Sequence, residues 1–596
     1  MKNIFKIAAV AVIGLSFASC EKFLDSTNYW SKTTADFPAT ADDAVNMVTG
    51  IYNNLNVLIG DSPLENFYLW SDLVSDDCLG GGGANDQKVQ AIDLMMNFGT
   101  DMMNVVYTDR YKGVARANLA IETLKNCSLD DSTLKQYMGE AFFLRAYYMY
   151  ELASIFGNVP YPTSSSVNSA QPQISGEALW GQILEDCKIA ADIMPAKKAS
   201  GDGHVDKYCA EALLGRVYLF ASGFLGIENI TIPAYSNDVI GVSIAEGTTV
   251  SKSDAGSYIT DCVNNSGYTL VDDPHNLWSY TNRCSVEDEL SPWKGNGYVW
   301  AENDGAVNPE AMFMVKFCTQ PTWGTTIGYS NQLALYFGVR GQSGMTDNGT
   351  CFPFGTGWGM GPVNPSLVAD WQAAEPGDKR LDASIIPVST WSGYVYGGDS
   401  NIQETGYYQT KVMPVEARKA DGSGFWTTFS NAMYEGSISW HADCGDDNFQ
   451  LSTINDLVLI RFAEVLLMDA ELNNSQASFD KVRARAGLGS KAISTENIRN
   501  ERRWELAFEG IRFNDIRRYG DDYAIAALNK QEGVECYNNG TKGDNHAAKF
   551  NGGYGERYKA TKGFAKFPES QISLSTGTAD FVQNEGYTIN DFPGWD

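Results

Sequence analysis

The residue types that favour ligand chemistry in this chain are tryptophans in its central part. Four of them lie beside Gly, Pro, Asn or Thr, so that no helical or strand periodicity accounts for them: Trp293, Trp300, Trp323 and Trp358. An aromatic ring offers about 150–250 Å² of surface, enough to stack on a flat apolar face of a ligand. Trp323 is the first candidate, because it closely follows the strand-like run 311–317. The alternative for each ring is that it anchors a long loop to the core.

A second candidate is the loop at residues 76–97, DDCLGGGGANDQKVQAIDLMMN. Its four successive glycines allow the backbone to approach a ligand closely. Polar side chains on both sides of the glycines could meet the hydroxyl groups of a ligand: Asp76, Asp77, Asn85, Asp86 and Gln87. No Lys-Ser or Lys-Thr pair follows the glycines, so a phosphate-binding loop is not supported. A plain surface loop is the alternative.

Metal and catalytic motifs are weaker. The four histidines are isolated, without a metal-binding spacing, and there is no GxSxG nucleophile motif. A pair of carboxylates for glycoside hydrolysis can be neither located nor excluded, since only geometry would show it. We therefore expect no catalytic residues, no metal and no cofactor. Calcium is the one alternative, at an acidic run that lacks EF-hand spacing: Asp443, Asp446, Asp447 and Asn448.

These candidates must be positioned by a mostly helical scaffold. Residues 42–226 and 456–520 contain apolar residues at helical spacing, with helix pairs every 35–45 residues or so, which is typical of tetratricopeptide-like helix hairpins. Residues 227–455 are rich in Gly, Asn, Asp, Ser and Trp and contain only short strand-like runs. Loops of such length in a compact protein are usually functional. We expect residues 20–596 to form one domain, with its ligand site in the loop-rich half.

The N-terminus and the charge restrict the location and the partners. Residues 1–19 have the charged start, the apolar centre and the small residues of a signal peptide, and Cys20 follows as the predicted lipidated residue. Phe17 stands where such sites usually have Leu, and an ordinary secretory signal is the alternative. The net charge of -29 disfavours nucleic acid or an anionic membrane surface as partner. Ten further cysteines lie far apart, and their pairing cannot be deduced from sequence.

Residues 498–520, IRNERRWELAFEGIRFNDIRRYG, form the most distinctive segment. Helical spacing of four apolar residues predicts one amphipathic helix over 498–511, which Gly510 would terminate: Trp504, Ala507, Phe508 and Ile511. Arginines and glutamates occupy the other positions, so that the helix surface carries many ion pairs.

This segment resembles the C-terminal signature of the SusD/RagB family, and four further segments resemble that family in the same order. They are YTDRYKGVARANLAIETL at 107–124, GEAFFLRAYYMYELASIFGNVPY at 139–161, LVLIRFAEVLLMDAEL with VRARAGL at 457–472 and 482–488, and FPESQISLS with QNEGY at 567–575 and 583–587. Gln571 stands where the closing element usually has Glu. The five segments together span nearly the whole chain.

The resemblance implies a lipid-anchored protein on the cell-surface side of the outer membrane. Family members bind oligosaccharides, or sometimes peptides, and act as a lid on a TonB-dependent, SusC-like transporter. Four tetratricopeptide-like helix pairs are expected to cradle the irregular ligand-binding half. The resemblance implies that charged residues of these segments hold helices together: Arg145, Arg502, Glu505, Glu509 and Arg512. A glycoside hydrolase of the same uptake system, a peptide-binding member and a purely structural partner are the alternatives.

Overall fold

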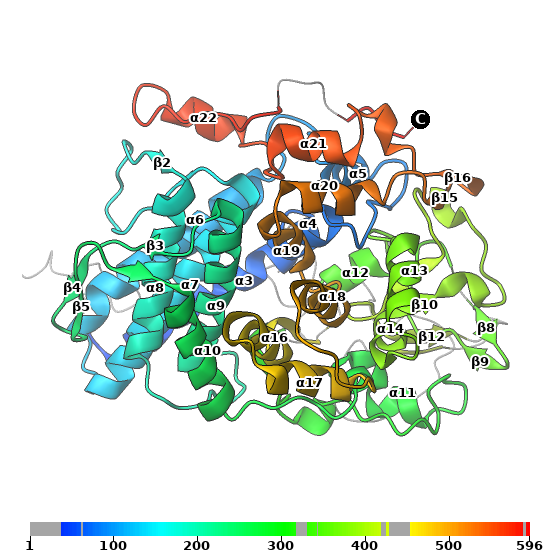
Figure 1. The fold of residues 1–596 in the computed structure, drawn as a ribbon, viewed down its shortest axis with the longest axis horizontal. Helices are drawn as coiled ribbons and strands as arrows, with labels where there is room; N and C mark the ends of the chain where they lie inside the picture. Colours follow the sequence, from blue (N-terminus) through cyan, green and yellow to red (C-terminus); the bar gives the residue numbers. More distant parts are fainter. Residues whose placement is uncertain are drawn as a thin grey trace, which may run out of the picture.

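The computed structural model describes residues 37–60, 64–317, 331–342, 344–418, 425–427, 453, 455–587 and 592–595. Helices from both ends of the sequence form one continuous array (Figure 1), in which each helix packs on the next. In order, these helices are α3 (Ala41–Gly60), α6 (Asn104–Thr123), α7 (Asp131–Phe156), α8 (Gly176–Ile193), α9 (Lys207–Leu225), α10 (Lys252–Asn265), α16 (Phe462–Asn473) and α17 (Gln476–Arg485). The predicted helix-hairpin scaffold is confirmed.

The array continues beyond the expected boundary at residue 226. Helix α10 lies in the part of the sequence that we expected to be loop-rich, yet it packs between α9 and α16. Ser251 and Asp254 form a reciprocal capping box at its start. Only four of its residues are buried, so its apolar stripe is narrow and easily missed in a polar sequence: Ala255, Gly256, Ile259 and Cys262.

Helix α7 illustrates how the sequence defines an element of the array. The Asp130 side chain accepts a hydrogen bond from the backbone N–H of Thr133, and Gly157, with φ of 69°, ends the helix. Every residue from Met138 to Phe156 is buried, which requires partners for the polar ones. Arg145 of α7 pairs with both oxygens of Asp186 in α8, at 2.6 and 2.7 Å. This buried pair joins two neighbouring helices.

The single helix expected over 498–511 is instead two shorter ones. Helix α18 (Thr495–Leu506) ends before Phe508, which adopts a φ of 63°, and α19 (Arg512–Arg518) follows. The break allows the Glu509 carboxylate to accept hydrogen bonds from Arg461 at 2.7 Å and from Lys411 at 2.6 Å. The apolar stripe is nevertheless buried as predicted: Trp504, Ala507, Phe508 and Ile511. The break between the two helices therefore coincides with the buried ion pairs of Glu509.

Buried ion pairs connect these helices to the rest of the molecule. Burial raises the pKa of Glu505, but the guanidinium groups of Arg485, Arg461 and Arg380 outweigh it and hold that pKa well below its ordinary value. Arg502 likewise donates to Asp515 at 2.8 Å. The five charged residues that were expected to be structural are all buried and paired, which confirms that role: Arg145, Arg502, Glu505, Glu509 and Arg512.

The loop-rich half contains short helices and strands. Its helices are α11 (Arg283–Glu287), α12 (Leu333–Phe337), α13 (Pro365–Ala374) and α14 (Lys379–Ser384). The strands of the described chain form antiparallel pairs: β1 (Val159–Pro160) with β2 (Gln173–Ile174), β3 (Ile230–Thr231) with β6 (Thr249–Val250), β4 (Tyr235–Asn237) with β5 (Val242–Ile244), β7 (Ala311–Val315) with β14 (Leu457–Arg461), β8 (Thr346–Asp347) with β9 (Thr350–Cys351), β10 (Ile385–Pro387) with β11 (Tyr407–Gln409), β12 (Glu416–Arg418) with β13 (Phe425–Thr427), and β15 (Glu535–Asn538) with β16 (Thr541–Asp544).

The β7–β14 pair anchors this half to the array. All five residues of β7 are buried, and β14 leads directly into α16. Shorter helices lie along one edge of the molecule (Figure 1): α5 (Gln87–Asp93), α20 (Asp521–Asn529), α21 (Tyr554–Thr561) and α22 (Glu569–Ser575). Helix α4 (Phe67–Leu73) lies beneath them and is entirely buried. Within the described ranges, no helix is both long and apolar enough to cross a membrane. Buried free thiols occur at Cys78, Cys127, Cys187, Cys209, Cys262 and Cys536.

Candidate ligand site

The predicted loop at residues 76–97 and the segment that follows Trp358 lie against each other, although about 280 residues separate them. The backbone N–H groups of Leu79 and Gly82 donate to the carbonyl oxygens of Pro362 and Gly359, both at 2.9 Å. Gly81 has a φ of 68°, and a Cβ atom there would lie 2.4 Å from Pro362. Glycine is therefore required where the two backbones meet. The glycine run brings one candidate loop onto the other.

Two glutamine side chains hold the backbone of the glycine loop. The Gln403 Oε1 atom accepts a hydrogen bond from the N–H of Gly81 at 3.1 Å, and Gln90 Nε2 donates to the carbonyl oxygens of Gly81 and Gly83. Gln403 in turn donates to the buried Asp93 at 3.0 Å. Burial raises the pKa of Asp93 to about 7. Neither glutamine was singled out from the sequence, because its role depends on distant backbone groups.

Trp358 is exposed at the junction of the two loops. Its side chain is 37% exposed, and it is the only exposed tryptophan among those whose burial the structure describes. The Trp358 N–H donates to the carbonyl oxygen of Leu335 in α12 at 2.9 Å, which fixes the backbone beneath the ring. The Arg340 guanidinium lies over the indole, 5.7 Å from its centroid.

Further polar side chains lie next to Arg340. Asp86 accepts a hydrogen bond from the N–H of Gly83 at 2.7 Å and lies 3.4 Å from the Arg340 guanidinium. Arg340 also pairs with Asp399 at 3.1 Å, while Asn85 is exposed beside Asp86. These residues are named the Trp358 cluster: Asn85, Asp86, Arg340, Trp358 and Asp399. The cluster offers an apolar plane together with hydrogen-bond donors and acceptors. Arg340 and Asp399 were not foreseen, since charged residues in a Gly-rich loop are common.

The other tryptophans have different environments. Trp300 is only 3% exposed, so the prediction that it stacks on a ligand is corrected. Trp293 is half-buried and packs on Tyr280 and Phe354, with ring centroids 4.7 and 5.6 Å apart. Its ring anchors a loop, which was the alternative interpretation. Trp323 lies outside the described residues.

Asp76 and Asp77 also have another role than the one predicted. Each is only 1% exposed. Asp76 accepts from Arg512 at 2.7 Å and from Arg503 at 2.9 Å, and Arg503 also donates to Asp77 at 2.9 Å. Burial alone would raise the pKa of Asp76, but the two guanidinium groups outweigh it and lower that pKa. Both carboxylates serve to join α18 and α19 to the start of the glycine loop.

The remaining predicted features are only partly accessible. In the part of the chain that the structure describes, no three His, Cys, Asp or Glu side chains form a metal-binding group. The predicted lipidation site Cys20 lies outside the described residues. So does the acidic run considered for calcium: Asp443, Asp446, Asp447 and Asn448.

Known proteins resemble this chain over most of its length. A family model described as starch-binding and associating with the outer membrane matches residues 22–219, and a model of the SusD family matches residues 366–587. The chain belongs to the SusD/RagB family. It is 22% identical over 512 residues to SusD-like protein P2 of Formosa agariphila, covering 82% of this chain and 84% of that protein. A SusD-like protein of Bacteroides ovatus is 22% identical over 559 residues, covering 88% of this chain and 85% of that protein.

Solved structures share the SusD-like fold. Surface glycan-binding protein A from Bacteroides fluxus superposes with a TM-score of 0.65 at 24% identity, covering 92% of this chain and 100% of that one. Surface glycan-binding protein A from Bacteroides thetaiotaomicron, in complex with laminarihexaose, gives a TM-score of 0.63 at 18% identity and covers the same shares of both chains. The fold class expected from the sequence, a helix-hairpin scaffold with a loop-rich half, is confirmed.

Proposed function

We propose that this protein captures glycans at the outer surface of the outer membrane and passes them, unchanged, to a TonB-dependent, SusC-like transporter. The observation that carries the proposal is the exposed indole of Trp358, framed by Asp86, Asn85 and Arg340 at the junction of two loops. A sugar ring has flat C–H faces and a rim of hydroxyls. The indole suits the face, and the surrounding carboxylate, amide and guanidinium groups suit the rim.

The similar proteins support a glycan rather than a peptide as the ligand. Two of the solved relatives are called surface glycan-binding proteins, and one of them is in complex with laminarihexaose. Another solved relative is called a laminarin-binding SusD-like protein, with a TM-score of 0.64 at 23% identity. A peptide ligand is the second candidate and would use the same exposed indole.

Binding without chemistry is the simplest use of the Trp358 cluster. Both of its acids pair with Arg340, which suits a fixed set of hydrogen-bonding groups better than a proton-transferring pair. A hydrolase would release new reducing ends from a polysaccharide. Incubating the protein with each glycan that it binds, and measuring reducing ends over hours, separates binding from hydrolysis.

A lipid on Cys20 would hold the protein at the membrane next to its transporter. Labelled palmitate is expected to enter the wild-type protein and not the Cys20→Ala variant. Co-purification with a SusC-like transporter from detergent-solubilised outer membranes tests the partner. Failure of both would leave a secreted binding protein instead.

The glycan site itself is tested with a panel of purified polysaccharides and oligosaccharides, including laminarin and starch. We expect wild-type protein to bind at least one of them and Trp358→Ala to lose most of that affinity. Leu574→Ala is the matched control, because Leu574 is 77% exposed and belongs to α22, away from the cluster. Unchanged affinity in Trp358→Ala would overturn the site.

A further inference from the structure

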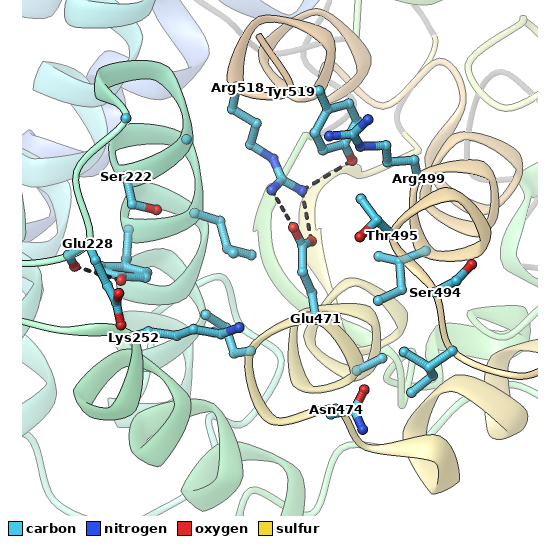
Figure 2. A pocket seen from close by; sticks show the side chains of 18 of the residues that line it. Ser222, Glu228, Lys252, Glu471, Asn474, Ser494, Thr495, Arg499, Arg518 and Tyr519 are labelled. Atoms are coloured by element: carbon cyan, nitrogen blue, oxygen red, sulfur yellow. Dashed lines mark hydrogen bonds and ion pairs between the residues drawn. The ribbon is translucent and has the colours of Figure 1, made fainter. Parts of the chain in front are cut away.

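A large pocket, shown in Figure 2, lies between the ends of several helices. Its volume is about 720 Å³, within the range of small-molecule sites. The C-terminal end of α9, the start of α10, the end of α16, the start of α18 and the end of α19 all contribute to its walls. No residue of the Trp358 cluster lines it. The pocket is therefore a separate place at which a ligand could bind.

One charged pair in the wall is internally neutralised. Arg518 donates to both oxygens of Glu471, at 2.6 and 2.8 Å. Such a bidentate ion pair has a specific geometry, and its two charges largely cancel, so that it attracts a charged ligand only weakly. It also fixes α19 against α16, which keeps this side of the pocket in place.

Two other cations have no such acid. Among the residues that the structure describes, no carboxylate forms an ion pair with Lys252 or Arg499, and the Arg499 Nε atom has no hydrogen-bond partner. The Arg499 guanidinium lies 4.3 Å from the ring centroid of Tyr519 and 4.9 Å from that of Tyr523, so its position is defined by stacking. The two cations face the pocket from α10 and α18.

The remaining acid in the wall is the exposed Glu228. In Figure 2 the Lys252 side chain extends away from Glu228 toward α16. With Arg518 and Glu471 cancelling, Lys252 and Arg499 against Glu228 leave the wall with a formal charge of +1. The whole protein carries -29. A positive recess in so acidic a protein favours a negatively charged ligand locally.

Neutral polar groups complete the wall: Ser222, Asn474, Ser494 and Thr495. Hydroxyl and amide groups of this kind exchange hydrogen bonds with sugar hydroxyls. The first turn of α18 also borders the pocket, and free N–H groups at a helix start favour an anion. We infer that this pocket binds a small acidic sugar, whose carboxylate meets Lys252 while its hydroxyls meet the neutral groups and Arg499 adds to the positive potential of the wall.

The test measures binding of D-glucuronate, and of its neutral counterpart D-glucose, to the full-length protein. Ligand-observed NMR titration gives both affinities. We expect glucuronate to bind and glucose not to bind at the same concentration. Lys252→Glu should weaken glucuronate binding about tenfold or more, because it replaces an attractive charge by a repulsive one. Lys252 is exposed, so this change spares the core.

Lys125→Glu is the matched control, since it makes the same change of net charge at another exposed lysine, in η1 (Leu124–Asn126). We expect it to keep wild-type affinity, and Trp358→Ala to keep it too, which separates this site from the proposed glycan site. Equal binding of glucose and glucuronate, or unchanged affinity in Lys252→Glu, would overturn the inference. Full competition by acetate at matched concentration would overturn its sugar part.

Discussion

The two ends of one short segment, residues 76–86, have opposite environments. At its start, Asp76 and Asp77 are buried and paired with Arg503 and Arg512. At its end, Asn85 is exposed and Asp86 is half-buried on the surface of the Trp358 cluster. All of these residues are short and polar, and only about ten positions separate them. The first end joins helices, and the second end is available to a ligand.

What differs between the two ends is the group that lies opposite. Helices α18 and α19 place guanidinium groups against the first end, so that its carboxylates are removed from water and must be paired. The glycines that follow pack on residues 359–362 and lead to Asp86, whose side chain is 23% exposed and lies 3.4 Å from Arg340. Charge removal should therefore affect folding at one end and binding at the other.

The largest effect is expected for Asp76→Asn. It leaves Arg512 buried with only part of its countercharge, which should lower the free energy of unfolding by about 3–5 kcal/mol. The same change at Asp86 should cost about 1 kcal/mol or less, because the pair is partly exposed and Arg340 keeps Asp399 as a partner. Chemical denaturation of both variants, followed by circular dichroism, measures the difference. Equal losses would remove the distinction between the two ends.

A smaller effect, on affinity rather than on stability, is expected for Trp358→Ala. Losing the indole should weaken glycan binding by about 1–3 kcal/mol, whereas the free energy of unfolding should change by about 0.5 kcal/mol or less. Trp300→Ala is the buried counterpart and should cost about 3–5 kcal/mol of stability. Calorimetric titration and denaturation of both variants test this. A Trp358→Ala protein that loses stability as Trp300→Ala does would show that its ring is structural.

Arg340→Gln should have a weaker effect again. Arg340 supports the indole and pairs with Asp86 and Asp399, so its loss should reduce glycan affinity by about 1 kcal/mol. Lys542→Gln, which removes another surface ion pair, with Glu535, serves as the control and should leave affinity unchanged. If Arg340→Gln binds as tightly as wild type, the guanidinium is not part of the site.

The sequence predicted the scaffold well because its signals are local. A helix over residues 132–156 could be predicted from apolar spacing and from Gly157, and the loop at residues 76–97 was recognised by its glycines. Long-range contacts could not be predicted. Trp300 and Trp358 both have glycines nearby in the sequence, yet Trp300 is buried and Trp358 is exposed. Distant segments of the chain cover the ring of Trp300 but leave that of Trp358 partly open. Arg340 and Gln403 gain their roles only once those segments meet.

The smallest expected effect concerns the pair of His204 and Glu140, which is neither fully buried nor fully exposed. His204 has a side chain 39% exposed, and its Nδ1 atom lies 2.7 Å from a carboxylate oxygen of the buried Glu140. That hydrogen bond raises the pKa of His204, although partial burial opposes the shift. Because the pKa is raised in the folded state, the stabilisation is fully present below the ordinary value of about 6.5 and is lost as the pH rises through the folded value.

His204→Gln should therefore cost more stability at pH 5.5 than at pH 8.5, by less than about 1 kcal/mol given its exposure. His275→Gln provides a control of opposite sign, because burial outweighs the Asp273 hydrogen bond and lowers the pKa of His275. The contribution of His275 to the free energy of unfolding decreases as the pH falls. His275→Gln should therefore be less destabilising at pH 5.5 than at pH 8.5. Denaturation curves of both variants at both pH values measure these differences. If the stability of His204→Gln and of His275→Gln, relative to wild type, changed in the same direction with pH, the two opposite pKa shifts would be contradicted.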